Sequence, residues 1–171
     1  PWGQWFRRIL NGFTHLYLQD EESARLLSDI GIHKFTVCGD TRFDRVAAIA
    51  KSVKEIPIVD KFARQKPILV AGSTWKPDEE LLARFINEND QIKYIIAPHE
   101  VTPENVSKLE QLLKTPTVRY SMANESDIHQ YQVIIIDSIG LLSSLYSYAK
   151  IAYIGGGFGA GIHNILEAAT F

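Results

Sequence analysis

Three kinds of feature are scarce in this sequence, and each absence narrows the class of protein. Cys38 is the one cysteine, so the chain cannot close an internal disulfide, which fits a reducing compartment. No run of about 18 uncharged apolar residues occurs, so we expect no membrane-spanning helix. The formal net charge of −2 provides no basic field for nucleic acid or an anionic membrane. Local groups must therefore hold any anionic ligand.

What is present is ordinary for a globular domain, since 46% of the 171 residues are hydrophobic and 22% are charged. The chain begins at Pro1 rather than at methionine, and it stops at Phe171 within an expected helix. A strand–helix unit of a parallel sheet normally continues into another strand. We therefore expect an internal piece of a longer protein.

Strands and helices alternate from residue 66 onward. Buried strands are expected over 67–71, 91–97, 133–136 and 151–154, with a weaker one over 117–121. Helices are expected from Pro77, over 104–114, over 141–149 and after the last strand. This order predicts an α/β fold, a Rossmann-like doubly wound parallel sheet with helices on both faces.

The first of these helices carries charged and apolar residues whose placement the sequence also predicts. Asp78, Glu79 and Glu80 fit a solvated helix start that complements the positive end of the helix. The core face is expected to consist of Leu81, Leu82, Phe85 and Ile86.

The part before residue 66 is less regular. It predicts a helix over 4–13, a strand over 15–19, a helix over 21–30 with Asp20 as N-cap, a strand over 34–38, and a connector with little sheet character over 56–66. After the strand, Arg42 is expected either to bind a phosphate or carboxylate or to form a salt bridge with Asp40 or Asp44.

A glycine-rich turn follows the last strand, with glycines at 155, 156, 157, 159 and 161, and residues 163–169 suit the first turns of a helix. Strand, glycine-rich turn and helix together point backbone N–H groups at an anion. The alternative is a tight turn that binds no ligand. Because parallel strands end at one edge of a sheet, this turn is expected to lie beside residues 72–74, 98–100 and 137–140.

Several side chains at this edge have both a ligand-binding and a structural interpretation. Glu167 suits a ribose diol or simple helix-start electrostatics, and His99 suits a ligand or a structural hydrogen bond. Asp137 either orients a neighbour or caps the next helix. His99 and His163 lack the spacing of zinc ligands, so no metal site is expected.

Five motifs in order resemble those of the bacterial Kdo transferases, the 3-deoxy-D-manno-octulosonic acid transferases of lipopolysaccharide synthesis. They are GDTRFDRV (39–46), AGSTW (71–75), IAPHE (96–100), DSIGLLSSLY (137–146) and YIGGGFGAGIHNILEAA (153–169). The resemblance implies a GT-B glycosyltransferase fold. Residues 1–33 would be the tail of its N-terminal acceptor domain, and residues 34–171 its C-terminal nucleotide-sugar domain, truncated at the C-terminal end.

The resemblance also implies an activity. The full enzyme would transfer Kdo from CMP-Kdo to a lipid A precursor at the cytoplasmic face of the inner membrane, as a peripheral membrane protein. It would use no cofactor, metal or nucleic acid. The general base of the family is a glutamate of the N-terminal domain, so this piece is expected to be soluble and to bind CMP-Kdo without catalysing transfer.

The donor contacts implied by the resemblance, together with the phosphate-facing residues, form one set of expected CMP-Kdo-binding residues: Ser73, Thr74, Ala97, Pro98, His99, Ile139, Gly140, Leu141, Gly156, Gly157, Phe158, Asn164, Ile165, Leu166 and Glu167. Two positions depart from the family pattern. Many members have Pro-Arg-His where this chain has Ala97-Pro98-His99, and Gly-Glu where it has Gly140-Leu141.

Three alternatives stay open from the sequence. Residues 155–160 also fit the G-x-G-x-x-A fingerprint of nicotinamide and flavin enzymes, although that fingerprint normally opens its domain. A GT-B transferase with a UDP-sugar donor and a non-catalytic interaction module are the other two.

Overall fold

The computed structural model describes residues 2–51, 53–159, 161–163 and 165–171. They divide into two compact units, Pro1–Ala48 and Ile49–Phe171. Within the described residues, no helix combines the length and the apolar character needed to cross a membrane.

The first unit is built on a pair of short parallel strands. It contains α1 (Trp2–Gly12), β1 (Leu16–Leu18), α2 (Glu21–Asp29), β2 (Phe35–Val37) and the beginning of α3 (Thr41–Lys51). Asp20 caps α2 as predicted, since its side chain accepts a hydrogen bond from the Ser23 N–H at 2.7 Å. The β1–β2 pair joins residues on both sides of the predicted domain boundary between 33 and 34, and that boundary stays a prediction.

Arg42 takes the structural alternative in this unit. Its guanidinium lies 2.6 Å from the Asp40 carboxylate, and the Arg42 backbone N–H donates to the same side chain. The hydrogen bonds from Arg42 lower the pKa of Asp40. Arg42 lies in the first turn of helix α3.

The second unit contains a five-stranded sheet in the order β5-β6-β4-β3-β7, and every neighbouring pair is parallel. The strands are β3 (Ile68–Thr74), β4 (Lys93–Pro98), β5 (Thr117–Arg119), β6 (Val133–Ile135) and β7 (Ile151–Ile154). The predicted parallel sheet is confirmed.

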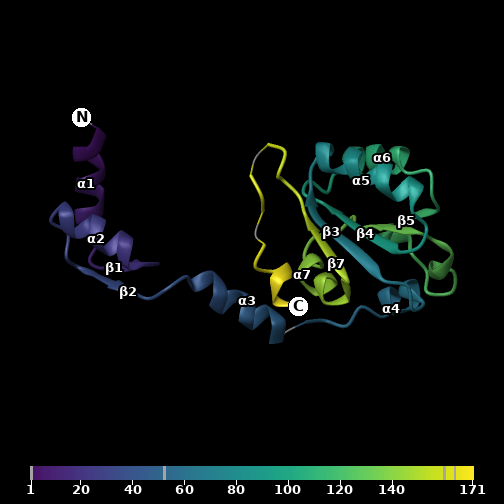
Figure 1. Ribbon diagram of the computed structural model, residues 1–171, viewed down its shortest axis with the longest axis horizontal. Helices are drawn as coiled ribbons and strands as arrows, with labels where there is room; N and C mark the ends of the chain where they lie inside the picture. The colour runs from purple at the N-terminus through teal and green to yellow at the C-terminus, as the bar shows by residue number, and fades with distance from the viewer. Residues whose placement is uncertain (1, 52, 160, 164) are drawn as a thin grey trace. The chain divides into compact units, whose positions relative to one another are not determined.

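Helices cover both faces of this sheet, as Figure 1 shows. One face carries α5 (Lys76–Glu88) and α6 (Pro103–Leu112); the other carries α4 (Pro57–Ala63), α7 (Leu142–Leu145) and the 3₁₀ turns η2 (Ile128–Gln130) and η3 (Tyr146–Tyr148). Strand residues alternate between the two layers, because successive side chains point to opposite faces. Val70 and Ile95 pack toward α4, whereas Leu69 and Ile96 pack toward α5 and α6.

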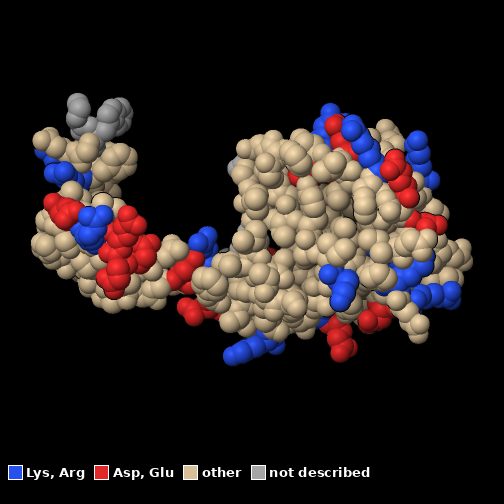
Figure 2. All heavy atoms as spheres, in the orientation of Figure 1, with Lys and Arg blue, Asp and Glu red and all other residues tan. Residues whose placement is uncertain are grey.

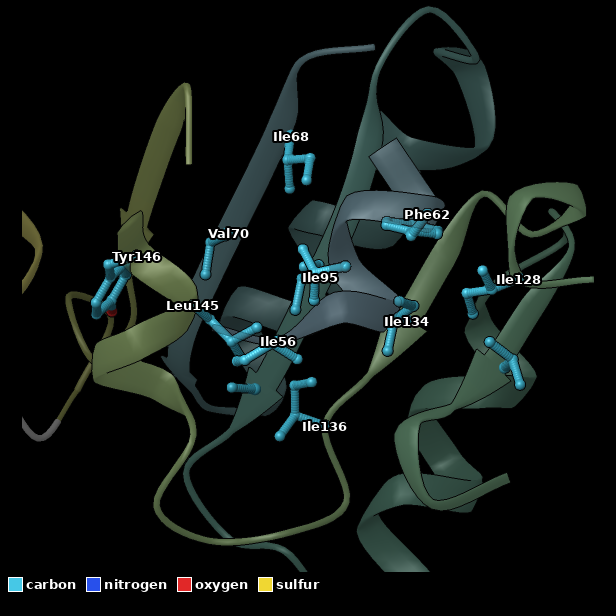
Figure 3. Packing of buried hydrophobic residues seen from close by; sticks show 13 residues of the cluster. Ile56, Phe62, Ile68, Val70, Ile95, Ile128, Ile134, Ile136, Leu145 and Tyr146 are labelled. Atoms are coloured by element: carbon cyan, nitrogen blue, oxygen red, sulfur yellow. The ribbon is translucent and has the colours of Figure 1, made fainter. Parts of the chain in front are cut away.

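The interpretation of residues 56–66 as a mere connector misses helix α4. Pro57 is its first residue, and Val59 and Phe62 are completely buried. In Figure 3, Phe62 lies over the strand residues Ile95 and Ile134. The apolar residues at 56, 59 and 62 carry the helical spacing that identifies this element.

Two further predictions, the core face of α5 and the burial of β7, are wrong in detail. In α5, Leu82, Ala83 and Ile86 are buried, but Leu81 and Phe85 are about half exposed because they lie on the outer side of the helix. Strand β7 is an edge of the sheet among the described residues, which leaves Ile151 exposed rather than buried.

The helix expected after the glycine turn is also not seen. The described part of residues 161–171 contains only the 3₁₀ turn η4 (Ala168–Thr170), beside α7 in Figure 1. Helices this short need tertiary contacts to form. In this segment Ala168 is the residue that packs on the buried cluster.

Candidate functional site

The carboxyl ends of β3, β4, β6 and β7 lie at one edge of the sheet, as predicted. Backbone hydrogen bonds extend the ladder there: His99 N–H donates to the Thr74 carbonyl at 2.9 Å, and Gly155 N–H to the Gly72 carbonyl at 2.9 Å. Ile136 N–H likewise donates to the Ile96 carbonyl at 2.8 Å. Open parallel sheets bind ligands at this edge.

Three aromatic rings meet at the edge and form what we call the Trp–His–His stack, made of Trp75, His99 and His163. The centroids of Trp75 and His99 are 4.4 Å apart, and so are those of His99 and His163. Trp75 Nε1–H donates to His163 Nε2 at 2.8 Å. Because Nε2 accepts this bond, a neutral His163 carries its proton on Nδ1.

His163 was not among the expected donor contacts, and spacing alone gives no signal for it. It is 64 residues from His99 in the sequence, so only the fold brings the two rings together. Among the described residues, no three histidine, cysteine or acidic side chains gather as metal ligands would.

Asp78 is buried, contrary to the prediction of a solvated acid. Its carboxylate accepts hydrogen bonds from Trp75 N–H at 2.9 Å, from the Tyr153 hydroxyl at 2.7 Å and from Gly156 N–H at 3.0 Å. Burial and this bond to Asp78 raise the pKa of Tyr153 to about 12. The position of Asp78 at the start of a helix predicted that it is solvated. In the structure, the glycine turn covers this side of the first turn of α5.

Close packing explains part of the glycine turn. Gly156 has φ +96°, and a Cβ there would lie 2.4 Å from the Gly161 carbonyl oxygen. A Cβ on Gly155 would lie 2.3 Å from the Ser73 carbonyl oxygen. Gly155 is therefore required by the packing of the turn against β3, and Gly156 by packing within the turn itself, whether or not a ligand binds.

A small cavity of about 170 Å³ lies beside the turn. Gly156 and Phe158, both expected donor contacts, line it together with Trp75.

A larger cavity of about 510 Å³ lies between α5 and α6 where β3 and β4 end, and we call it the α5–α6 cavity. Thr74 and Pro98, which are expected donor contacts, form part of its wall with Trp75. Glu79 is the buried acid of this wall, with 8% of the residue exposed. The remaining residues are Lys76, Glu80, Glu100, Asn105, Lys108, Gln111 and Leu112.

Glu79 is thus also buried, and the prediction of a solvated side chain is wrong for it, whereas Glu80 is exposed as expected. One carboxylate oxygen of Glu79 accepts a hydrogen bond from the Thr74 hydroxyl at 3.1 Å. Burial, more than the nearby charge of Asp78, raises the pKa of Glu79. The other oxygen has no partner among the described residues.

The loop after β6 is partly exposed. Ile139 is 92% exposed, Gly140 has φ +94°, and Leu141 packs against the buried cluster. Asp137 does not cap the following helix. It accepts hydrogen bonds from the backbone and hydroxyl of Ser121 and thereby holds a neighbouring loop.

The remaining expected contacts differ in their surroundings. Ser73 adopts a left-handed conformation with φ +52°, and Ala97 is buried within β4. Gly157 and Ile165 are exposed, and Leu166 and Glu167 are half-buried. The charge of Glu167 contributes, after burial, to the pKa of about 12 of Tyr146 in η3. Asn164 lies outside the described residues.

No protein-family model matches the chain. Curated relatives do: a 3-deoxy-D-manno-octulosonic acid transferase of Rickettsia bellii is 26% identical over 174 residues, which is 97% of this chain and 40% of the relative. The transferase of the same name from Chlamydophila psittaci is 33% identical over 111 residues, or 63% of this chain and 25% of the relative. The chain thus spans well under half the length of these relatives.

Among solved structures, the chain is similar to the C-terminal CMP-Kdo binding domain of WaaA from Acinetobacter baumannii. The TM-score is 0.51 at 24% identity, over 74% of this chain and 64% of that one. This likeness confirms the predicted α/β fold, a parallel sheet with helices on both faces. By sequence the chain is similar to bacterial Kdo transferases, and by fold it is similar to the C-terminal CMP-Kdo binding domain of one of them.

Proposed function

We propose that this chain is the donor-binding part of a Kdo transferase and that it binds CMP-Kdo at the carboxyl edge of its sheet. The observation that carries the proposal is the meeting of the loops after β3, β4, β6 and β7 at that edge, each with residues of the expected donor set. The names of the relatives and of the structural neighbour support the choice of ligand.

Hydrogen-bond donors at the edge suit the phosphate of the nucleotide. The Gly156 N–H is already donated to Asp78, so it is not available. The N–H groups of Gly157 and Phe158 have no partner among the described residues, and neither do the ring nitrogens of His99. His163 adds Nδ1–H when it is neutral. These donors would hold the phosphate without the helix N-terminus that the sequence predicts.

The full enzyme would use this bound donor for glycosyl transfer. A hydroxyl of the lipid A precursor attacks the anomeric carbon of Kdo, the bond from that carbon to the phosphate oxygen breaks, and CMP leaves. Hydrogen bonds to the phosphate stabilise the charge of the leaving group. The base that takes the proton of the hydroxyl would belong to the acceptor domain, as would contact with the inner membrane, and residues 1–33 would be the tail of that domain.

Calorimetric titration tests the proposal directly. The 171-residue chain should bind CMP more tightly than UDP or NAD, and Glu167→Ala and Asn164→Ala should each weaken CMP binding about tenfold through loss of a hydrogen bond to ligand. Glu88→Ala, an exposed acid at the end of α5, is the matched control and should leave the affinity unchanged.

The outcome also separates the alternatives. Preference for UDP would indicate another GT-B donor, preference for NAD a dinucleotide-binding domain, and a flat titration with every nucleotide a non-catalytic module. The chain alone should transfer no Kdo to a lipid A precursor, and detectable transfer would contradict the assignment of the base to the acceptor domain.

A further inference from the structure

The α5–α6 cavity lies on the opposite side of the strand ends from η3 and η4. Its wall includes Thr74 and Pro98 at the ends of β3 and β4, so a ligand on the carboxyl edge can extend into it. Its volume of about 510 Å³ falls within the range of small-molecule sites, which is roughly 300 to 1,000 Å³.

Glu79 gives this cavity an unmet hydrogen-bonding capacity. The residue is only 8% exposed, one carboxylate oxygen is held by Thr74, and the other has no partner among the described residues. An ionised carboxylate only accepts hydrogen bonds, so it suits a ligand group that donates them. This second oxygen keeps access to solvent, so it can accept a hydrogen bond from a ligand or from water in the cavity.

The charges around the cavity argue against an anion. Glu79, Glu80 and Glu100 contribute three carboxylates, whereas Lys76 and Lys108 contribute two ammonium groups. Lys108 is paired with Glu104 at 2.6 Å, which leaves less positive charge for a ligand. Figure 2 shows acidic and basic side chains interspersed over α5 and α6 rather than a basic patch. A phosphate would therefore be repelled.

The lining fits a hydroxylated sugar instead. Carboxylates and the amides of Asn105 and Gln111 can accept from and donate to hydroxyl groups, and Trp75, Pro98 and Leu112 offer apolar surface to the C–H groups of a ring. In CMP-Kdo, the carboxylate and the phosphate are both attached at the anomeric carbon of the sugar. The hydroxyl groups lie toward the other end of its eight-carbon chain.

We infer that the α5–α6 cavity is the sugar subsite of the donor and receives the hydroxylated end of Kdo, with Glu79 as its main hydrogen-bond acceptor. This inference rests on the proposed function. The phosphate and the sugar carboxylate stay outside the cavity at the Trp–His–His stack and the glycine turn. Glu79 should then contribute to the affinity for CMP-Kdo but not to the affinity for CMP alone.

The test compares two ligands on the same variants. Calorimetry is run on the 171-residue chain with CMP and with freshly prepared CMP-Kdo. Glu79→Gln keeps the bond from Thr74 but removes the charge, and Gln111→Trp fills the cavity from an exposed position on α6. Each should weaken CMP-Kdo binding about tenfold and change CMP binding less than twofold, since a hydrogen bond to a charged group is lost or the space is occupied.

Two further variants serve as controls. Glu88→Gln and Gln91→Trp make the same chemical changes at exposed positions outside the cavity wall and should leave both affinities unchanged. CMP binding with no loss of CMP-Kdo binding in Glu79→Gln and Gln111→Trp overturns the sugar subsite alone. No binding of CMP by the unmodified chain overturns the proposed function, and the subsite with it.

Discussion

The first turn of α5 carries two adjacent acids, Asp78 and Glu79, whose surroundings differ. On the side of the glycine turn, Asp78 accepts hydrogen bonds from three donors and is 1% exposed. On the side of α6, Glu79 is nearly as buried but has one hydrogen-bond donor and borders a cavity. Both side chains are therefore largely buried, but only Asp78 has both of its oxygens hydrogen-bonded by the protein.

The difference separates a structural role from a binding role. A carboxylate with all its bonds made fixes the geometry around it, and here it ties the glycine turn and β7 to the start of α5. A buried carboxylate with an open oxygen retains capacity for a ligand. Burial alone would not have distinguished the two residues.

The largest effect is expected from Asp78→Ala. This change leaves the N–H groups of Trp75 and Gly156 and the Tyr153 hydroxyl without their acceptor, so the free energy of unfolding should fall by about 3 kcal/mol. Urea unfolding of the two proteins measures the difference. Glu80→Ala, at the exposed neighbouring acid, should change stability by less than about 0.5 kcal/mol. Equal stabilities of Asp78→Ala and Glu80→Ala would contradict the structural role of Asp78.

Gly156→Ala should be the next most damaging change. Alanine must adopt φ +96° and place a Cβ against the Gly161 carbonyl oxygen, which should cost about 2 kcal/mol of unfolding free energy. Gly159→Ala is the matched control in the same turn, since its Cβ would meet nothing within 4 Å. Thermal melting of both variants compares them, and equal losses would contradict the packing argument.

Tyr153→Phe sharpens the comparison by removing one of the three donors to Asp78. We expect a loss of about 1 kcal/mol near neutral pH, the value of one hydrogen bond. The pKa of Tyr153 is about 12 in the folded protein against 10.0 ordinarily, so its contribution to stability is present below pH 10 and lost as the pH rises toward 12. Unfolding measured from pH 8 to 11 should therefore show a shallower alkaline decline in the variant than in the unmodified chain.

The smallest expected effect is a pH dependence of stability caused by Glu79 in the α5–α6 cavity. Burial holds its pKa above the ordinary 4.5, so the folded state binds this proton more tightly than the unfolded state does. Its contribution to stability is therefore present below pH 4.5 and is lost as the pH rises through the folded pKa. Relative to Glu79→Gln, the unmodified chain should gain thermal stability when the pH is lowered from 7 to 5. A difference that stays constant with pH would mean that this carboxyl is not desolvated.

Periodicity was enough to predict the parallel strands from residue 66 onward and the edge at which their loops meet. Runs such as 133–136 have no polar residue that an exposed face would require, and this indicates a sheet covered on both sides. The same reasoning failed for Leu81 and Phe85, because an apolar residue at a helical position does not say which neighbouring layer, if any, covers it.

For the candidate site, the sequence predicted which loops meet but not the burial or the contacts of their side chains. Asp78 and Glu79 follow Pro77 in a pattern typical of a solvated helix start, and their burial depends on the glycine turn on one side and α6 on the other. The contact between His99 and His163 likewise depends on two strands, β4 and β7, that flank β3 in the sheet.

The sequence by itself determined the alternation of strands and helices, and with it the sheet edge at which the loops meet, because hydrophobic period and glycine content act locally along the chain. Only the tertiary structure decided which polar groups at that edge are already satisfied and which are open. A hydrogen bond needs its two partners within about 3 Å, and residues 75 and 163, or 78 and 156, come that close only after the layers have packed.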